Sequence, residues 1–187
     1  MKKIILGTLA AAVFMTMSAS AFRAHAQEPN VEEIRMQENT TMVNPMSEYS
    51  KEEFGQKIGV YLEAPQGVSN VHYFLYTNQD GLLGEMQFTM QGKDYSQRVM
   101  ATSKLSLHDM SEGDLETFTG VYGNWKNAKT NKVGYCEAFT LEENGQKTIV
   151  WLDVAPGIVY SVTTSDTSVT MNELVAIVNQ LFVPVQG

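Results

Sequence analysis

Apolar and polar residues alternate along most of the chain after residue 60, and this alternation predicts β-strands. Met86, Phe88 and Met90 fall on one side of such a strand, and the polar residues between them fall on the other. Turn sequences such as Asn144-Gly145 separate the segments, and short connections favour antiparallel pairing. We expect a sheet of about seven antiparallel strands, drawn from eight candidate segments: 60–64, 71–77, 83–90, 95–102, 120–126, 133–141, 148–154 and 158–164.

Two segments with helical periodicity begin with a capping box. Ser50 precedes Glu53 by three residues in the first, and Thr170 precedes Glu173 by three in the second. In this motif the hydroxyl accepts a hydrogen bond from the backbone N–H three residues on, and the glutamate accepts from the N–H of the cap residue. We therefore expect an α+β fold, in which a twisted antiparallel sheet carries an N-terminal and a C-terminal helix on one face.

Residues 103–119 interrupt this order, since they keep neither a two-residue nor a 3.6-residue period. We interpret them as a surface loop with one helical turn. With only two helices to cover the sheet, one of its faces is then expected to be open.

The N-terminus has the three parts of a secretory signal peptide. Lys2 and Lys3 precede an apolar run over residues 4–17, and Ala24-His25-Ala26 matches a cleavage site. The apolar run is shorter than the ~20 residues that a spanning helix needs, so we expect a secreted protein with no membrane span after cleavage. Cleavage after Ala21 is the alternative. The expected division is a signal peptide (1–26), a flexible polar leader (27–47) and a single α+β domain (48–187).

Charge and cysteine content narrow the choice of partners. The full chain has 13 basic and 21 acidic residues and a net charge of −8; without residues 1–26 it keeps 10 basic and 21 acidic residues, a net charge of −11. An acidic protein is a poor match for nucleic acid, whose phosphates require a basic face. The single cysteine excludes an internal disulfide and a multi-cysteine zinc site. We expect neither a metal nor a cofactor.

Cys136 is the first candidate for chemistry. It is a potential nucleophile if His72 or His108 lies beside it, but no local protease motif surrounds it. Its place in a strand next to apolar residues favours a buried, unreactive side chain. An intermolecular disulfide is the third alternative.

The acidic segment around His108 is the second candidate. His108 and Asp109 are followed closely by further carboxylates, which are Glu112, Asp114 and Glu116. Calcium binding is disfavoured because the spacing does not match an EF-hand, but a hydrolase with His108 as general base remains an alternative. Glu137 and Asp153, on strands among apolar neighbours, form a third candidate, a carboxylate pair of the glycosidase type. Alternating strands often carry one outward carboxylate each, so we favour outward-facing, solvated side chains over this pair.

The order of short motifs along the chain is familiar from a group of bacterial proteins. These motifs are NPM at 44–46, LEAP at 62–65, YFLY at 73–76, QRVM at 97–100, VWLD at 150–153, IVYSV at 158–162 and the helix from Thr170. The chain resembles an uncharacterised family of secreted or envelope-tethered α+β domains from Gram-positive, often gut, bacteria, which is distantly similar to sensor and lipoprotein-carrier half-barrels. Residues 103–119 and 130–136 depart from that pattern. The resemblance implies binding or sensing rather than turnover.

Aromatic side chains crowd the expected strands, and an open sheet face would expose some of them as a binding surface. Tyr95, Tyr122 and Trp125 are our candidate ligand-binding residues. The sequence therefore predicts a secreted, non-enzymatic module that binds an unknown protein or small molecule on the open face. The alternatives are the hydrolase around residues 108–116 and a surface protein that self-associates through that face. The oligomeric state is not set by the sequence.

Overall fold

A computed structural model describes residues 46–78 and 81–182. The predicted signal peptide and nearly all of the predicted leader lie outside the described residues. The strands are β1 (Met46–Tyr49), β2 (Ser69–Asn78), β3 (Gly81–Met90), β4 (Lys93–Ala101), β5 (Lys129–Val133), β6 (Cys136–Glu143), β7 (Gln146–Asp153) and β8 (Ile158–Thr164). The helices are α3 (Lys51–Ile58), α4 (Glu112–Thr119) and α5 (Met171–Leu181), with short 3₁₀ helices η1 (Leu107–Asp109) and η2 (Trp125–Asn127).

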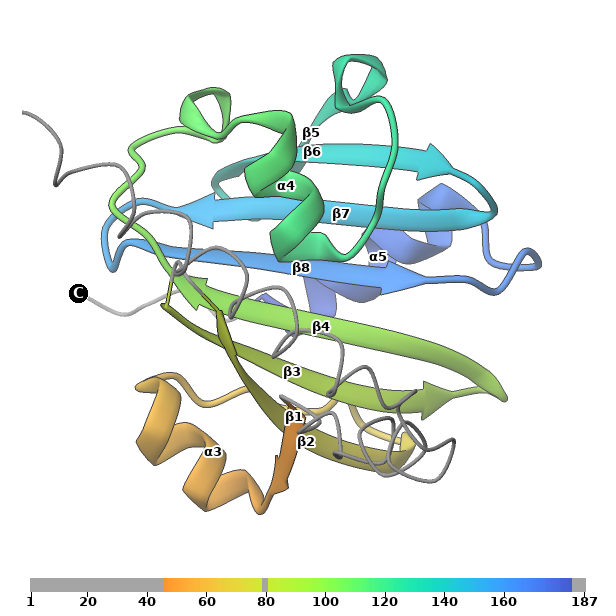
Figure 1. Ribbon diagram of the computed structural model, residues 1–187. Coiled ribbons are helices and arrows are strands. Elements are labelled where there is room, and N and C mark those ends of the chain that lie inside the picture. The colour runs from red at the N-terminus through yellow and green to blue at the C-terminus, as the bar shows by residue number, and fades with distance from the viewer. Residues whose placement is uncertain (1–45, 79–80, 183–187) are drawn as a thin grey trace, which may run out of the picture. The chain divides into compact units, whose positions relative to one another are not determined.

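The eight strands form one antiparallel sheet in the order β1-β2-β3-β4-β8-β7-β6-β5 (Figure 1). Strands β1 to β4 make a meander, and β8 pairs with β4 at the centre of the sheet. This pairing sets Tyr160 opposite Val99 of β4 on one side and opposite Trp151 of β7 on the other. Residues far apart in the sequence therefore become neighbours at the middle of the sheet.

The α+β class and the antiparallel sheet are confirmed, but two of the expected strands were wrong. Segment 60–64 forms the connection between α3 and β2, and segment 120–126 forms a loop that leads into η2. Both contain apolar residues that are buried without strand pairing, such as Leu62 and Val121. In turn, β1 and β5 were missed, because their short polar sequences carry little alternation. Strand β1 also takes Met46 and Ser47 from the expected leader by pairing with β2.

Both faces of the sheet carry helices, so the expectation of a single covered face was also wrong. On one face, Phe54 of α3 and Leu174 and Val178 of α5 join a core with the inward side chains of the strands. On the other face, η1, α4 and η2 enclose a second core over β6, β7 and β8. Figure 1 shows α4 in front of the sheet and α5 behind it. The apolar residues of segment 103–119 escaped notice because they are divided between a 3₁₀ turn and a helix, which have different periods.

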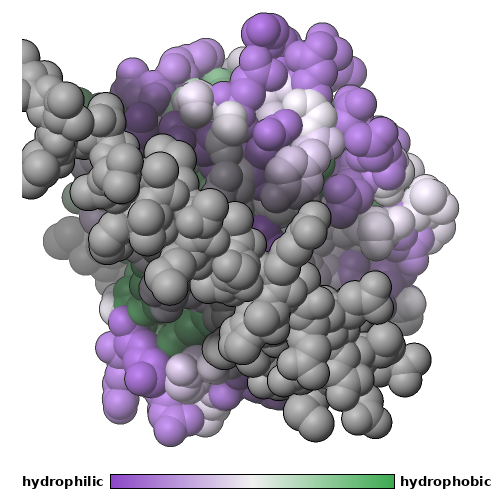
Figure 2. Space-filling model, in the orientation of Figure 1, coloured by the Kyte–Doolittle hydropathy of each residue, from purple (hydrophilic) through white to green (hydrophobic). Residues whose placement is uncertain are grey.

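The α4 side of the molecule is the one seen in Figure 2. Its outer surface over α4 is largely hydrophilic, whereas a hydrophobic area remains visible above α3. On this side of the sheet, β2 and β3 carry the half-buried Phe74, Tyr76 and Gln87, of which Tyr76 packs against the core under α4. Of the expected open face, only a strip of polar and apolar side chains on β2 and β3 is left uncovered among the described residues.

A buried ion pair ties α4 to this strip. Glu85 of β3 is almost fully buried and accepts hydrogen bonds from Arg98 Nε (2.7 Å), Gln87 Nε2 (2.7 Å) and the Tyr76 hydroxyl (3.1 Å). Arg98 also donates through Nη1 to the carbonyl oxygen of Phe118 near the end of α4 (3.2 Å). One guanidinium therefore neutralises a buried carboxylate and holds a helix end on the sheet.

In the described part of the chain, no helix combines the length and the apolar character required to traverse a lipid bilayer.

Candidate functional site

The three residues nominated for ligand binding do not share a surface. Tyr95 is 4% exposed and stacks on Phe88 in the core under α5, with ring centroids 5.4 Å apart. Trp125 is 5% exposed in the core under α4, where its Nε1 donates to the carbonyl oxygen of Val121. Only Tyr122 is open to solvent, at 66%. The expected joint exposure was wrong because η2 turns the indole of Trp125 inward.

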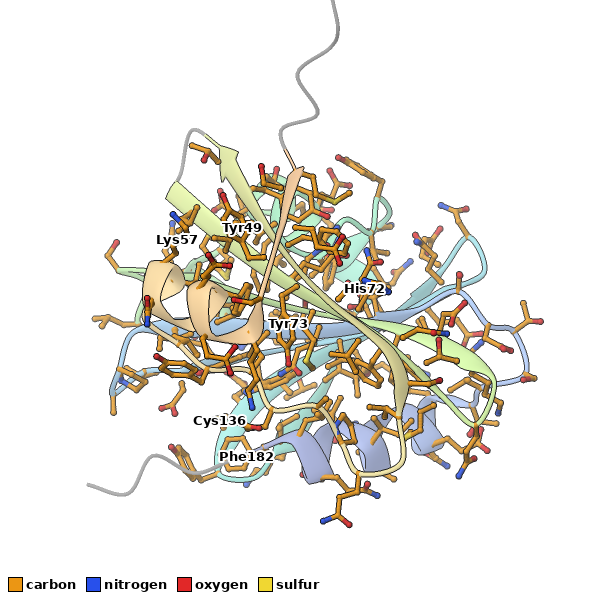
Figure 3. All side chains as sticks on the ribbon, turned by 90° about the horizontal axis from the view of Figure 1, so that it is seen from below. Tyr49, Lys57, His72, Tyr73, Cys136 and Phe182 are labelled. Carbon is orange, nitrogen blue, oxygen red and sulfur yellow. The ribbon has the colours of Figure 1, made fainter. Side chains whose placement is uncertain are left out.

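Cys136 is a buried free thiol, as its apolar setting predicted. Burial, and secondly the charge of Asp153, raises its pKa to about 11, so it stays protonated at neutral pH. His72 lies on the other half of the sheet, where its Nδ1 is 2.6 Å from Glu48 Oε1. Figure 3 shows this separation: Cys136 lies near Phe182 at the end of α5, and His72 lies away from both. The arrangement does not support a nucleophilic cysteine.

The acidic residues around His108 have structural tasks. Asp114 forms a capping box with Ser111 at the start of α4, which lowers the pKa of its carboxyl group. Glu112 pairs with Lys126, and Glu116 accepts a hydrogen bond from the N–H of Gly123. A hollow of about 230 Å³ lies beside α4, lined in part by Asp114 and Lys104 but not by His108.

His108 itself lies on the surface. Its Nε2 is 3.4 Å from Glu137 Oε1, and its ring meets Phe139 edge-on at 5.0 Å. Glu137 is exposed, whereas Asp153 is 3% exposed. The two carboxylates thus lie in different environments, although both border one cavity described below.

A cavity of about 220 Å³ lies on the α5 side of the sheet, between the end of α5 and the α3–β2 connection. We call it the Asp153 cavity. Its floor comes from the central strands β4, β7 and β8, and its two walls come from residues 60–63 and from the end of α5. Its polar and aromatic lining residues are Tyr61, Glu63, Gln97, Trp151, Asp153, Tyr160 and Phe182.

Two buried oxygen atoms on this floor lack hydrogen-bond partners. Asp153 accepts a bond from the Tyr135 hydroxyl at Oδ2 (3.0 Å), but its Oδ1 has no partner. Gln97, also 3% exposed, has no partner for Oε1. Buried polar atoms in proteins are nearly always paired, and an unpaired one costs ~1–3 kcal/mol. Both atoms belong to residues that line the same cavity, so donor groups of a ligand in this cavity lie near two acceptors that have no partner among the described residues.

Two of the aromatic rings that line the cavity pack directly against glycines. In α3, Gly55 leaves the space that the ring of Tyr61 occupies, and Gly134 does the same for the ring of Phe182. Any Cβ at either glycine would collide with the ring. On the floor, Trp151 and Tyr160 stack with centroids 5.2 Å apart and planes 10° from parallel. Sequence and fold together hold four rings around the unpaired oxygens.

A second cavity of about 340 Å³ adjoins the first and shares Asp153 with it. It is bordered by three apolar side chains that are largely exposed, Leu105, Tyr135 and Val154. The ring of Tyr135 meets Phe182 of the first cavity edge-on at 5.2 Å. Asp153 therefore lies at the junction of two hollows, with Tyr135 as its one hydrogen-bond donor among the described residues.

Sequence reasoning found Asp153 only as half of a carboxylate pair, and it missed Gln97, Tyr61 and Phe182. One signal was available: Asp153 ends a strand whose four preceding residues are all apolar, a position where a solvated carboxylate is out of place. Gln97 gave no such signal, because a glutamine on a central strand is recognised as buried only once β4 is known to pair with β8.

Within residues 46–78 and 81–182, no group of three or more His, Cys, Asp and Glu side chains is placed to hold a metal ion. The cavity therefore has to be interpreted from its carboxylate, amide and rings. Comparison of the chain with protein-family models, with curated proteins and with solved structures finds no match.

Proposed function

We propose that this protein is a non-enzymatic binding module that takes a small ligand in the Asp153 cavity. The observation that carries the proposal is the pair of unpaired oxygens, Asp153 Oδ1 and Gln97 Oε1, on a floor surrounded by aromatic rings. A concave, mostly apolar pocket with a few convergent polar groups is the usual form of a small-molecule site. The signal peptide expected at residues 1–26 supports binding outside the cell.

The hydrolase alternative has weaker support. Its candidate base, His108, is exposed and engaged with Glu137, and the acidic residues near it cap or brace α4 and the loop that follows. The self-association alternative rested on an open apolar sheet face, and α4 covers much of that face.

The two tryptophans offer a direct test, because one lies on the cavity floor and the other in the opposite core. We expect small fragments to shift the ¹⁹F resonance of 5-fluorotryptophan at Trp151 saturably and to leave that of Trp125 in place. The fragment set contains cationic, neutral and anionic head groups, and Trp151→Phe assigns the signals. If no fragment moves the Trp151 resonance, or both resonances always move together, the proposed site is wrong.

A matched pair of glycine variants tests the cavity wall. Gly55 and Gly113 both lie inside eight-residue helices, but only Gly55 has an aromatic ring against its Cα. We expect Gly113→Ala to raise the free energy of unfolding by up to ~1 kcal/mol and to leave fragment binding unchanged. Gly55→Ala should not raise the free energy of unfolding and should weaken fragment binding, because the new Cβ displaces the ring of Tyr61. Equal behaviour of the two variants in denaturation and ¹⁹F titrations would show that Tyr61 does not shape the site.

A further inference from the structure

The charges around the Asp153 cavity have one sign. Asp153 and Glu63 are its charged lining residues among those described. Glu63 is exposed and paired with Lys51 Nζ at 2.6 Å, which leaves it neutralised. Asp153 is buried, and its hydrogen-bond partner is a neutral hydroxyl. A buried carboxylate without a cation is costly unless a counter-charge arrives, so the floor of the cavity favours a positive group.

The neighbouring groups suit a cation that carries N–H donors. Gln97 Oε1 is a second unpaired acceptor on the floor. The strand register sets Gln97 four residues along the strands from Asp153, so it faces another part of the ligand than the ammonium that Asp153 binds. The rings of Tyr61, Trp151 and Phe182 add aromatic surfaces, which attract cations through their negative faces. An anion would meet Asp153 with no compensating base.

One phenol and one thiol lie near Asp153, and neither supplies it with a counter-charge. Burial, and secondly the charge of Asp153, raises the pKa of Tyr160 to about 12, and the same causes raise that of Cys136 to about 11. A phenol and a thiol are neutral or negatively charged in every protonation state, so neither group can serve as the counter-ion of Asp153.

We propose that the Asp153 cavity binds a small organic cation, a primary ammonium on a short apolar or aromatic body, with Asp153 as its counter-ion. This inference rests on the proposed function and names the ligand class for the same site. The apolar body would lie against the ring walls and the half-buried Leu181.

Three probes of similar shape test the ligand class separately from the question whether the cavity binds any ligand. Cyclohexylmethylammonium, cyclohexylmethanol and cyclohexanecarboxylate are titrated at pH 7 against the protein labelled with 5-fluorotryptophan. We expect the Trp151 resonance to report binding of the ammonium about tenfold tighter than of the alcohol, and no binding of the carboxylate. If the alcohol or the carboxylate binds as tightly as the ammonium, the ligand class is wrong and the proposed function stands. If none of the three probes and no member of the fragment set binds, both fail.

Asp153→Asn keeps the shape of the side chain and removes its charge. We expect this variant to lose about tenfold in ammonium affinity and to bind the alcohol as before. Asp109→Asn, which removes the same charge from an exposed position of η1, is the control and should leave both affinities unchanged. An equal loss in both variants would mean that net charge, not Asp153, attracts the ammonium. The Trp125 resonance reports whether each variant is folded. If Asp153→Asn does not fold, the ratio of the ammonium affinity to the alcohol affinity, measured on the wild-type protein, decides the proposal.

Discussion

Replacing Arg98 with methionine is expected to lower the free energy of unfolding by about 3–5 kcal/mol at pH 7. The guanidinium is the ion-pair partner of Glu85, whose side chain is almost fully buried, and it also holds the carbonyl of Phe118. Removing it leaves a carboxylate in the interior whose remaining side-chain donors, among the described residues, are the uncharged Tyr76, Gln87 and Ser96. Chemical denaturation of the two proteins at pH 7 gives the difference.

The same variant should change how stability depends on pH. Burial raises the pKa of Glu85, but the charge of Arg98 and the hydrogen bonds from Gln87 and Arg98 outweigh it, so the pKa lies below its ordinary value. In the wild type, the stability from this group is present above the unfolded-state pKa and is lost as pH falls through the lower folded-state pKa. Without Arg98 the pKa of Glu85 rises, and the carboxyl destabilises the variant as it ionises. The deficit should therefore be smaller in acid than at pH 7.

Two further variants identify the cause. Arg98→Met combined with Glu85→Gln removes both charges and should recover most of the loss, since uncharged partners leave no buried ion. Lys51→Met, which breaks the exposed pair with Glu63, should change stability little. A single-variant loss that the second substitution does not reduce would show that Arg98 acts by packing or by its contact with α4, and not through Glu85.

The sequence predicted those elements whose signals are local. The capping boxes at Ser50 and Thr170 are present at the starts of α3 and α5. A third box, Ser111 with Asp114, starts α4, and it was missed because an aspartate stands where glutamate or glutamine is usual. Alternation located most of the sheet, but it misassigned segment 60–64, where Leu62 is buried by tertiary packing and not by strand pairing.

The candidate site depends on contacts that no local pattern contains. Gln97 and Asp153 are 56 positions apart in the sequence and line one cavity only because β8 joins β4 to β7. Tyr61 and Phe182 reach the cavity from the chain segments that follow α3 and α5, and glycines in α3 and in the β5–β6 turn fix their positions. The site that we propose therefore lies on another face of the sheet than the one expected from the sequence. A binding role was inferred from an open sheet, whereas the hollow is formed between elements on the face that carries α3 and α5.

Replacing Phe118 with alanine should destabilise the protein by about 3–5 kcal/mol, because its ring is almost fully buried between α4 and the sheet. Thr117, the preceding residue, is exposed on the same helix, so Thr117→Ala should change the free energy of unfolding by no more than about 0.5 kcal/mol. The comparison distinguishes two descriptions of residues 103–119, since a surface loop predicts two neutral substitutions and a packed helix predicts one severe and one neutral. If both substitutions have equal, small effects in denaturant titrations, residues 103–119 do not cover this face of the sheet. The open face would then again be an alternative binding surface to the Asp153 cavity.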